Sequence, residues 1–439
     1  MTRTGFYTEP LPALAAGDLL VVDIGQLCTV HHPQADQEGP RRGAGLRDAG
    51  VIAHGALAVR QGRVLAAAPE PELRQAMQVG ARAPAGVEVI SAGGQAVVPG
   101  FVDPHTHAVF GRTRQDEYER RLRGETYLEI AAAGGGIRAS VRDLRQRSED
   151  ELVALTVPRL RRLMGNGTTT LEIKSGYGLS LAAELKMLRV ARRAAKEAGV
   201  RAVLTCLAAH EVPDEYRERR ADYVALVCDE VLPTVVAAGL AERCDVFCEP
   251  SVFDLGETEK ILRRAMDLGL RCTVHADELE ALGGAALAAR LGADSADHLL
   301  RVDEAGIAAL AGSRTVATLL PGTVFSLGLN HYAPARRLID AGCAVALATD
   351  FNPGSSPLAS LPLIQSIACS QMKLSPAEAL VASTLNAAWS LGLAGEVGSL
   401  APGKAADFLI LRGDDFRLVP YYGGVDMVAA VFWGGRRVA

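Results

Sequence analysis

The sequence lacks the cysteine pairs that would indicate a disulfide framework. Its eight cysteines include no CxxC spacing, and most of them stand inside apolar runs. Cysteine in such runs behaves as a small buried hydrophobe. We therefore expect reduced, buried thiols in a cytoplasmic protein.

Long apolar runs and an excess of one charge are also absent. No segment approaches the roughly 20 apolar residues of a membrane-spanning helix, and the start, MTRTGFYTEPLPALAAGD, holds no apolar core of a secretory signal. The 46 basic and 51 acidic residues are interspersed and give a net charge of −5. These features argue against nucleic-acid and membrane partners and favour a cytoplasmic location.

Strand-like and helix-like segments alternate through the middle of this 439-residue chain. Apolar residues at three- and four-residue steps predict helices, as over 182–199 and 256–269. Eight short β-rich runs separate the helical segments. They span residues 97–103, 168–174, 202–208, 245–249, 272–277, 293–298, 315–321 and 344–350. Eight strand–helix units favour an α/β fold with a parallel (β/α)8 TIM-like barrel, and a doubly wound sheet is the alternative.

The two ends of the chain share a different, strand-rich pattern. Residues 1–96 and 401–439 both contain short strands punctuated by glycine and proline. We expect these two segments to build one small β-sandwich-like domain together. Residues 97–400 would then form the barrel.

Five of the nine histidines stand at the ends of expected strands. His105 and His107 follow the first strand at a spacing of two, which points both side chains the same way along an extended chain. Asp350 ends the last strand. The remaining three histidines of this group are His210, His275 and His298. In a (β/α)8 barrel the carboxyl ends of the strands meet at one face, which carries the active site.

These side chains suit a divalent metal ion. Three imidazoles and one carboxylate can hold a metal and leave a position open for water, whose pKa the metal lowers to about 7. We assign as ligands His105, His107, His275 and Asp350. Glu278 is near enough to the site to move a proton, and His298 could hold the water or polarise a carbonyl oxygen. The alternative is a barrel whose polar strand ends bind only solvent.

Several motifs resemble those of the amidohydrolase superfamily of metal-dependent hydrolases. They are PGFVDPHTH, HADE, SADH, ATD and GSLAPGKAADFLIL. Within the superfamily, HTHAVFGRTRQDEYERRL, LEIKSGYGL, AAHEVPDEY and ATDFNPGSSP resemble the branch that opens the ring of 4-imidazolone-5-propanoate to N-formimidoyl-L-glutamate in histidine degradation. The resemblance covers about residues 97–400. It implies zinc or iron as the cofactor, a small-molecule substrate and a homodimer.

The resemblance also assigns residues to the substrate. Arg114 falls where a guanidinium grips the propanoate, and Arg112 is a nearby competitor. Tyr177 and His210 match contacts to the ring and its substituents, and Glu278 would lie near a ring nitrogen. The product contacts fall on Asn352, Gly354 and Ser355.

The reaction implied is hydrolysis of a cyclic amide C–N bond. Asp350 would serve as a ligand and as acceptor of the water's proton, Glu278 would protonate the leaving nitrogen, and His298 would stabilise the oxyanion. The lysine that bridges two metals in some superfamily members lies on strand 4. Strand 4 ends here in Glu249, and Lys174 ends strand 2, so we expect one metal.

Two other functions remain open at this point. A deaminase of a cytosine- or guanine-like ring from the same superfamily would use the same ligands and the same HxxE pattern. A non-catalytic barrel that serves as a scaffold typically loses metal ligands, and none is missing here.

Overall fold

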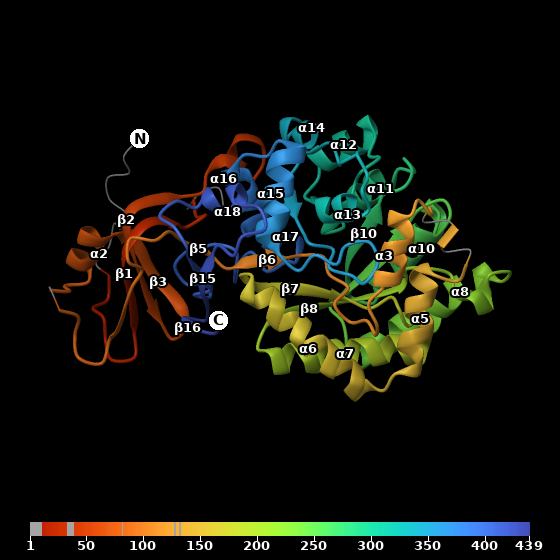
Figure 1. Ribbon diagram of the computed structural model, residues 1–439, viewed down its shortest axis with the longest axis horizontal. Coiled ribbons are helices and arrows are strands. Elements are labelled where there is room, and N and C mark those ends of the chain that lie inside the picture. The colour runs from red at the N-terminus through yellow and green to blue at the C-terminus, as the bar shows by residue number, and fades with distance from the viewer. Residues whose placement is uncertain (1–10, 33–38, 81, 127–128, 131–132) are drawn as a thin grey trace.

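The computed structural model describes residues 11–32, 39–80, 82–126, 129–130 and 133–439. It contains two eight-stranded sheets, one parallel and curled into a barrel and one built from both ends of the chain (Figure 1). Part of the stretch examined for a secretory signal, residues 1–10, lies outside the described residues. Among the described helices, none is both long and apolar enough to cross a membrane.

The barrel strands pair in the order in which they follow one another along the chain. They are β6 (Phe101–Asp103), β7 (Thr168–Lys174), β8 (Arg201–Ala209), β9 (Arg243–Cys248), β10 (Arg271–Ala276), β11 (Ser295–His298), β12 (Val316–Leu319) and β13 (Val345–Leu347). Every neighbouring pair is parallel. The expected TIM-like barrel is confirmed, and the doubly wound alternative is wrong, because chain neighbours are also sheet neighbours throughout.

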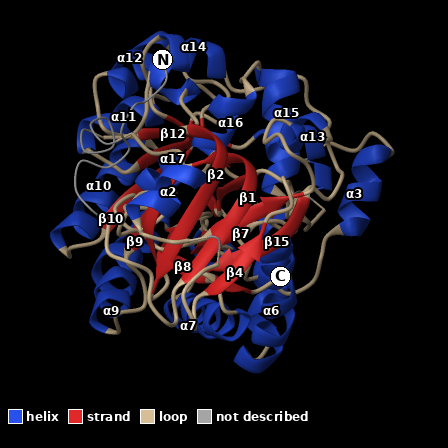
Figure 2. Cartoon of the chain, turned by 90° about the vertical axis from the view of Figure 1, so that its left-hand side faces the viewer, coloured by secondary structure: helices blue, strands red, loops and turns tan. Residues whose placement is uncertain are grey.

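Helices surround the strands (Figure 2). Those of the barrel region are α3 (Gln115–Leu122), α5 (Gly136–Gln146), α6 (Glu149–Gly165), α7 (Leu181–Ala198), α8 (Arg220–Leu226), α9 (Leu232–Ala237), α10 (Leu255–Asp267), α11 (Gly284–Leu291), α12 (Glu304–Ala311), α13 (Pro321–Ser326), α14 (Ala335–Asp340), α15 (Leu361–Met372), α16 (Pro376–Ala382) and α17 (Leu385–Ser390). Short helical turns lie at η1 (Gly43–Arg47), η2 (Asp214–Tyr216) and η3 (Val227–Val231). The helices expected over 182–199 and 256–269 are α7 and α10.

The join between β6 and β13 is made by the segments that follow these two strands. The Asp350 N–H donates to the His105 carbonyl at 3.0 Å, and the His107 N–H donates to the Phe351 carbonyl at 2.9 Å. Below them, the buried Asp103 carboxylate accepts the Thr349 N–H at 3.0 Å. The barrel is therefore closed by the same short segments that carry three of the expected ligands.

The strand β7, with the sequence TTTLEIK, shows why charged residues enter the barrel interior. Side chains alternate along a strand, so Leu171 and Ile173 join the main apolar cluster while Glu172 and Lys174 face the other way. Lys174 Nζ lies 3.8 Å from Asp297 on β11, a strand that does not border β7. This contact crosses the barrel, so its interior holds ion pairs as well as apolar side chains.

The second sheet brings the two ends of the chain together. Its strands are β1 (Leu19–Cys28), β2 (Val51–Arg60), β3 (Arg63–Pro69), β4 (Glu88–Ser91), β5 (Val97–Pro99), β14 (Phe408–Leu411), β15 (Val428–Trp433) and β16 (Arg436–Arg437). The helices α2 (Glu70–Ala76) and α18 (Leu418–Tyr421) belong to the same terminal segments. Strand β5 lies between β1 and β14, so residues from opposite ends of the chain pair directly (Figure 1).

The run expected as one barrel strand over 97–103 is divided into two strands in different sheets. Strand β5 belongs to the terminal sheet, and β6 begins the barrel. Gly100 separates them, and a Cβ at this position would lie 2.3 Å from Thr169 Oγ1. The crossing therefore needs glycine because the neighbouring barrel strand packs against its backbone. The domain boundaries at 96/97 and 400/401 stay a proposal.

Both faces of the terminal sheet are apolar. Leu19 and Val21 of β1 belong to one apolar cluster, in which the ring centroids of Phe408 and Phe432 lie 4.3 Å apart. Leu20 and Val22 of the same strand belong to a second apolar cluster on the opposite face. Polar contacts then fasten the sheet to the barrel. Asp407, just before β14, pairs with Arg201 at the start of β8 at 2.5 Å. The sheet thus lies at the amino ends of barrel strands, away from their carboxyl ends.

Candidate active site

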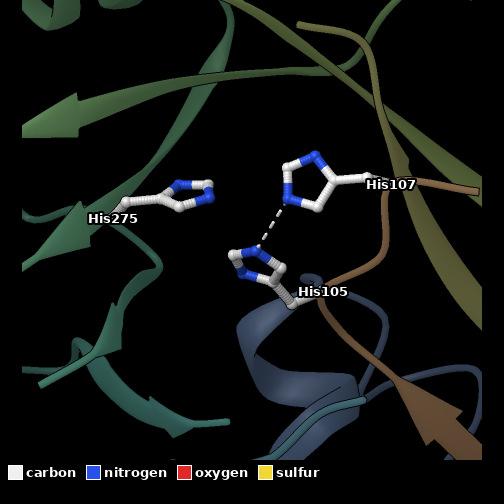
Figure 3. A group of neighbouring side chains, drawn as sticks. All are labelled: His105, His107 and His275. Carbon is white, nitrogen blue, oxygen red and sulfur yellow. Dashed lines mark hydrogen bonds between the residues drawn. The ribbon is translucent and has the colours of Figure 1, made fainter. Parts of the chain in front are cut away.

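Three of the expected ligands converge at the carboxyl ends of the barrel strands. His105 and His107 come from the segment after β6, and His275 from β10 (Figure 3). The Nε2 atoms of His105 and His107 are 3.2 Å apart. One ligand atom from each of the three rings lies within 4.8 Å of those of the other two, and all three residues are buried.

Asp350 brings the fourth expected donor to the same point. Its Oδ1 lies 3.6 Å from His105 Nε2 and 3.5 Å from His107 Nε2. Ligands about 2.1 Å from a tetrahedral metal are separated from one another by about 3.4 Å. The three measured separations match this value, so the donor set fits a single metal ion.

Two buried carboxylates fix the orientation of two of the rings. The Nδ1 of His105 lies 2.6 Å from Asp297 Oδ2, and the Nδ1 of His275 lies 2.9 Å from Asp245 Oδ2. An ionised carboxylate only accepts hydrogen bonds, so the Nδ1 of His105 carries the proton and this ring offers the lone pair of Nε2. The contact of His275 Nδ1 with Asp245 is an ion-pair approach without hydrogen-bond geometry, and the negative charge beside Nδ1 favours the same tautomer.

Burial keeps most of the site histidines neutral. It lowers the pKa of His105, His107 and His298 well below their ordinary value, and that of His210 to about 3. Burial acts the same way on His275, but the charge of Asp245 outweighs it and raises the pKa of this ring. A neutral imidazole is the form that binds a metal.

Glu278 and His298 face each other beside the histidine cluster. His298 Nδ1 lies 3.4 Å from Glu278 Oε1, and the His298 ring centroid is 5.4 Å from that of His105. Neither ring nitrogen of His298 has a hydrogen-bond partner within the described residues, although both are buried. Burial, and then the nearby charge of Asp350, raises the pKa of Glu278 to about 8. The raised pKa favours the protonated form of Glu278 at neutral pH.

Two further carboxylates hold the loop that carries Glu278. Glu249, just after β9, accepts the backbone N–H groups of Glu278, Leu279 and Glu280 at 2.6 to 3.2 Å. Asp277 accepts those of Leu282, Gly283, Gly284 and Ala285 at the start of α11. Glu249 is thus used by the loop and does not point to the metal cluster.

Left-handed backbone at two site residues breaks the alternation of strand side chains. His298 has φ +75° and Asp350 has φ +51°, a region that non-glycine residues adopt rarely. Because His298 turns at the end of β11, both Asp297 and His298 reach the histidine cluster. Such strained residues occur where the surrounding structure imposes them, which is common at active sites.

Arg114 is buried at the start of α3 and contacts the loop after Asp350. Its guanidinium pairs with Glu117 at 2.5 Å and lies against the backbone of Gly354, where a Cβ would be 2.2 Å from Arg114 Nη1. Arg112 is exposed, and its N–H donates to Asp143. Of the two expected candidates, Arg114 is therefore the one brought to the site.

Tyr177 and His210 form one wall beside His107. The His210 ring stacks on His107 with centroids 5.1 Å apart, and the Tyr177 ring lies 5.9 Å from His107 and 5.5 Å from His210. His210 Nδ1 is 3.0 Å from the Gly176 carbonyl, which makes Nδ1 the protonated nitrogen. The Nε2 of His210 remains as the acceptor on this ring.

Asn352 organises the loop that carries Gly354 and Ser355. Its Oδ1 accepts the N–H of both residues at 2.8 Å, and its Nδ2 donates to the Asp350 carbonyl at 2.7 Å. Ser355 is half-buried, and its Oγ accepts from Asn352 Nδ2 at 3.0 Å. The amide of Asn352 is thus engaged by the loop itself.

The two carboxylates that orient the rings were not predicted from the sequence. Asp245 and Asp297 stand inside the expected strands, and only His298 of SADH was singled out. A signal was present, because each aspartate stands within a short strand expected to be buried in the barrel, and both are buried in the structure. A charge in such a position is seldom buried without a partner.

Comparisons with known proteins identify the family of this chain. The chain matches the Amidohydrolase family over residues 96–438. It is 50% identical to the imidazolonepropionase of Symbiobacterium thermophilum over 96% of this chain and 97% of that protein. It is 46% identical to the imidazolonepropionase of Geobacillus kaustophilus over 90% of this chain and 92% of that protein. The chain belongs to the amidohydrolase family. Within that family it belongs to the imidazolonepropionases.

Solved structures confirm the fold. An adenosine deaminase from Xanthomonas campestris with bound zinc has a TM-score of 0.70 at 20% identity, covering 98% of this chain and 93% of that one. The guanine deaminase of E. coli has a TM-score of 0.69 at 18% identity, covering 96% and 99%. At such low identity these likenesses concern the fold alone.

Proposed function

We propose that this chain hydrolyses the cyclic amide C–N bond of 4-imidazolone-5-propanoate and releases N-formimidoyl-L-glutamate. The observation that carries the proposal is a buried guanidinium, Arg114, next to the loop that follows Asp350. A substrate that joins a hydrolysable ring to a carboxylate needs both a metal centre and a fixed cation near it. Membership among the imidazolonepropionases supports the same reaction.

We propose one zinc or iron ion, held by His105, His107, His275 and Asp350. When bound, the ion supplies a water that is nucleophilic at neutral pH and draws charge from the ring carbonyl. Lys174 does not suit a second ion. A bridging carbamate forms on a neutral amine, whereas the Lys174 side chain lies 2.6 Å from Glu172 and 2.8 Å from Asp245, which favour its charged form.

The proton transfers follow from the side chains around the metal site. Asp350 accepts a proton from the attacking water, and Glu278, protonated at neutral pH, gives a proton to the ring nitrogen that leaves. His298 donates a hydrogen bond to the carbonyl oxygen as negative charge develops on it. The carbonyl carbon gains the oxygen of water and the nitrogen gains hydrogen, so the product contains one more water than the substrate.

Binding is proposed to rest on a second group of residues. Arg114 grips the propanoate with two parallel hydrogen bonds, and its pairing with Glu117 holds the guanidinium ready in the unbound protein. Tyr177 and His210 form a wall for the ring. The loop of Asn352, Gly354 and Ser355 contacts the product.

The proposal is tested by the turnover of freshly generated 4-imidazolone-5-propanoate. Its ultraviolet absorbance should disappear, formimidoylglutamate should form, and a chelator should abolish both until zinc or iron is restored. Ammonia release from a cytosine- or guanine-like ring, with no turnover of the imidazolone, would identify a deaminase instead. The homodimer and the cytoplasmic location remain predictions, the first to be checked by sedimentation.

A further inference from the structure

Lys174 is a fully buried ammonium in the barrel interior, enclosed by three carboxylates. Its Nζ lies 2.6 Å from Glu172 Oε2, 2.8 Å from Asp245 Oδ2 and 3.8 Å from Asp297 Oδ2. None of these four side chains is exposed to solvent. Lysine is almost never buried so completely unless it is paired.

Two of the three carboxylates also hold metal ligands, through the same oxygen atoms that face Lys174. Asp245 Oδ2 is 2.9 Å from His275 Nδ1, and Asp297 Oδ2 is 2.6 Å from His105 Nδ1. These carboxylates come from β9 and β11, and the rings from β10 and the segment after β6. The Lys174 ammonium therefore approaches both carboxylates, and each of these supports a proposed ligand on a different element.

We propose that Lys174 is a positioning residue of the metal centre, which holds Asp245 and Asp297 beneath the rings of His275 and His105 so that both rings present Nε2 to the ion. This inference rests on the metal site proposed above. It concerns a side chain that neither ligates the metal nor touches the substrate.

The physical reason is charge balance in a medium of low dielectric constant. Glu172, Asp245 and Asp297 would repel one another strongly in the barrel interior without a cation between them. Burial alone would lower the pKa of Lys174, but these three carboxylates outweigh it and raise that pKa above its ordinary value. The ammonium thus stays charged and keeps the carboxylates together.

Removing the ammonium has a defined structural consequence. The carboxylates must then move apart, take up protons or admit water. Each of these changes alters the acceptor that faces a ring Nδ1, and so alters which nitrogen of that ring carries the proton. Metal affinity should fall even where the fold survives.

The test is Lys174→Met, alone and combined with Glu172→Gln, on the full-length chain. The double variant removes the carboxylate nearest to Lys174 and spares both carboxylates that touch the histidines. Zinc affinity of the metal-stripped proteins is measured by chelator competition. We expect both variants to bind zinc about 10- to 100-fold more weakly than the unmodified chain, the usual effect of losing a ligand's support.

A matched control removes a buried ion-paired charge far from the metal site. Glu378 on α16 is fully buried and pairs with Arg47 and Arg336, both at 3.1 Å. Glu378→Gln should lower the melting temperature and leave zinc affinity unchanged. This variant separates a loss of stability from a loss of metal affinity.

The possible results test the role of Lys174 separately from the proposed metal site. Wild-type zinc affinity in the double variant would mean that Lys174 only neutralises Glu172, and the inference would be wrong. If Lys174→Met alone is too unstable to purify, the double variant decides. If the double variant also fails to fold, Lys174 is required for the fold as a whole and the inference is wrong. An unmodified chain that takes up no metal would overturn the proposed metal site itself.

Discussion

His105 and Asp350 meet twice, through their backbones and through their side chains. The Asp350 N–H donates to the His105 carbonyl at 3.0 Å, and Asp350 Oδ1 lies 3.6 Å from His105 Nε2. One residue follows the first barrel strand and the other follows the last. The pair therefore joins the ends of the barrel sheet and contributes two of the four proposed ligands.

Metal removal should loosen this join. With the ion stripped, the amide hydrogens of Asp350 and His107 should exchange faster with solvent, because the shared metal no longer adds to the hydrogen bonds that hold the two segments together. Hydrogen exchange measured by mass spectrometry on the loaded and stripped protein checks this. The amides at the centre of the β9–β10 ladder serve as the control and should not change. Equal protection of Asp350 in both forms would contradict the prediction.

Glu278→Gln should keep the metal and lose turnover. The amide cannot deliver a proton to the leaving nitrogen, so kcat should fall by about 10²- to 10⁴-fold. Metal content and steady-state rates check this on the same preparation. Glu280→Gln is the control, because Glu280 is exposed on the same loop. Full activity of Glu278→Gln would exclude the proposed role.

The contribution of Glu278 to the stability of the metal-free protein should fall as pH rises. The pKa of Glu278 is raised from 4.5 to about 8, chiefly by burial. Its protonated form therefore stabilises the folded chain fully below about pH 4.5, and this contribution is lost as pH rises to about 8. The loss is on the order of 4 kcal/mol. The buried histidines titrate in both proteins, so the readout is the free energy of urea unfolding of the unmodified chain minus that of Glu278→Gln. This difference should be smaller at pH 8 than at pH 5, and an equal difference at both pH values would contradict the prediction.

Arg114→Met should weaken substrate binding. Losing a charge-assisted grip on the propanoate should raise KM about 10- to 100-fold. Arg112→Met is the matched control, because Arg112 is exposed and the N–H that donates to Asp143 is kept in this variant. An increase of KM in the Arg112 variant alone would reverse the assignment.

Gly354→Ala should act through Arg114. The new Cβ would stand 2.2 Å from Arg114 Nη1, so the guanidinium must shift away from the loop. We expect KM to rise with little change in melting temperature. Gly395→Ala is the control, because a Cβ there meets nothing within 4 Å. Unchanged KM in Gly354→Ala would show that the guanidinium position does not matter for binding.

Much of the fold could be predicted because each barrel strand is short, buried and bounded by a helix. The strand expected over 168–174 is β7 itself. The division of 97–103 could not be predicted, because VVPGFVD is one apolar run and its sequence does not say which sheet each half joins. The close packing of Thr169 against Gly100, which the crossing between the sheets accommodates, belongs to the tertiary structure and cannot be seen in the run itself.

The site was predicted as far as the periodicity of strands allows. His105 and His107 were expected to point the same way, and their Nε2 atoms lie 3.2 Å apart. Asp297 and His298 are neighbours in the chain, yet both side chains reach the histidine cluster. This arrangement depends on the left-handed backbone of His298 at the end of β11, which the alternation of strand side chains does not predict. The network of Lys174 depends on contacts across the barrel, between strands that no local pattern connects.

The place of β5 in the terminal sheet has a consequence for synthesis on the ribosome. Its partner β1 is made early, whereas β14 is made near the end of the chain. Until then one edge of β5 has no strand to pair with, while β6 to β13 are already available to pair with one another. The terminal sheet therefore cannot be completed until β14 has been synthesised, after all eight strands of the barrel.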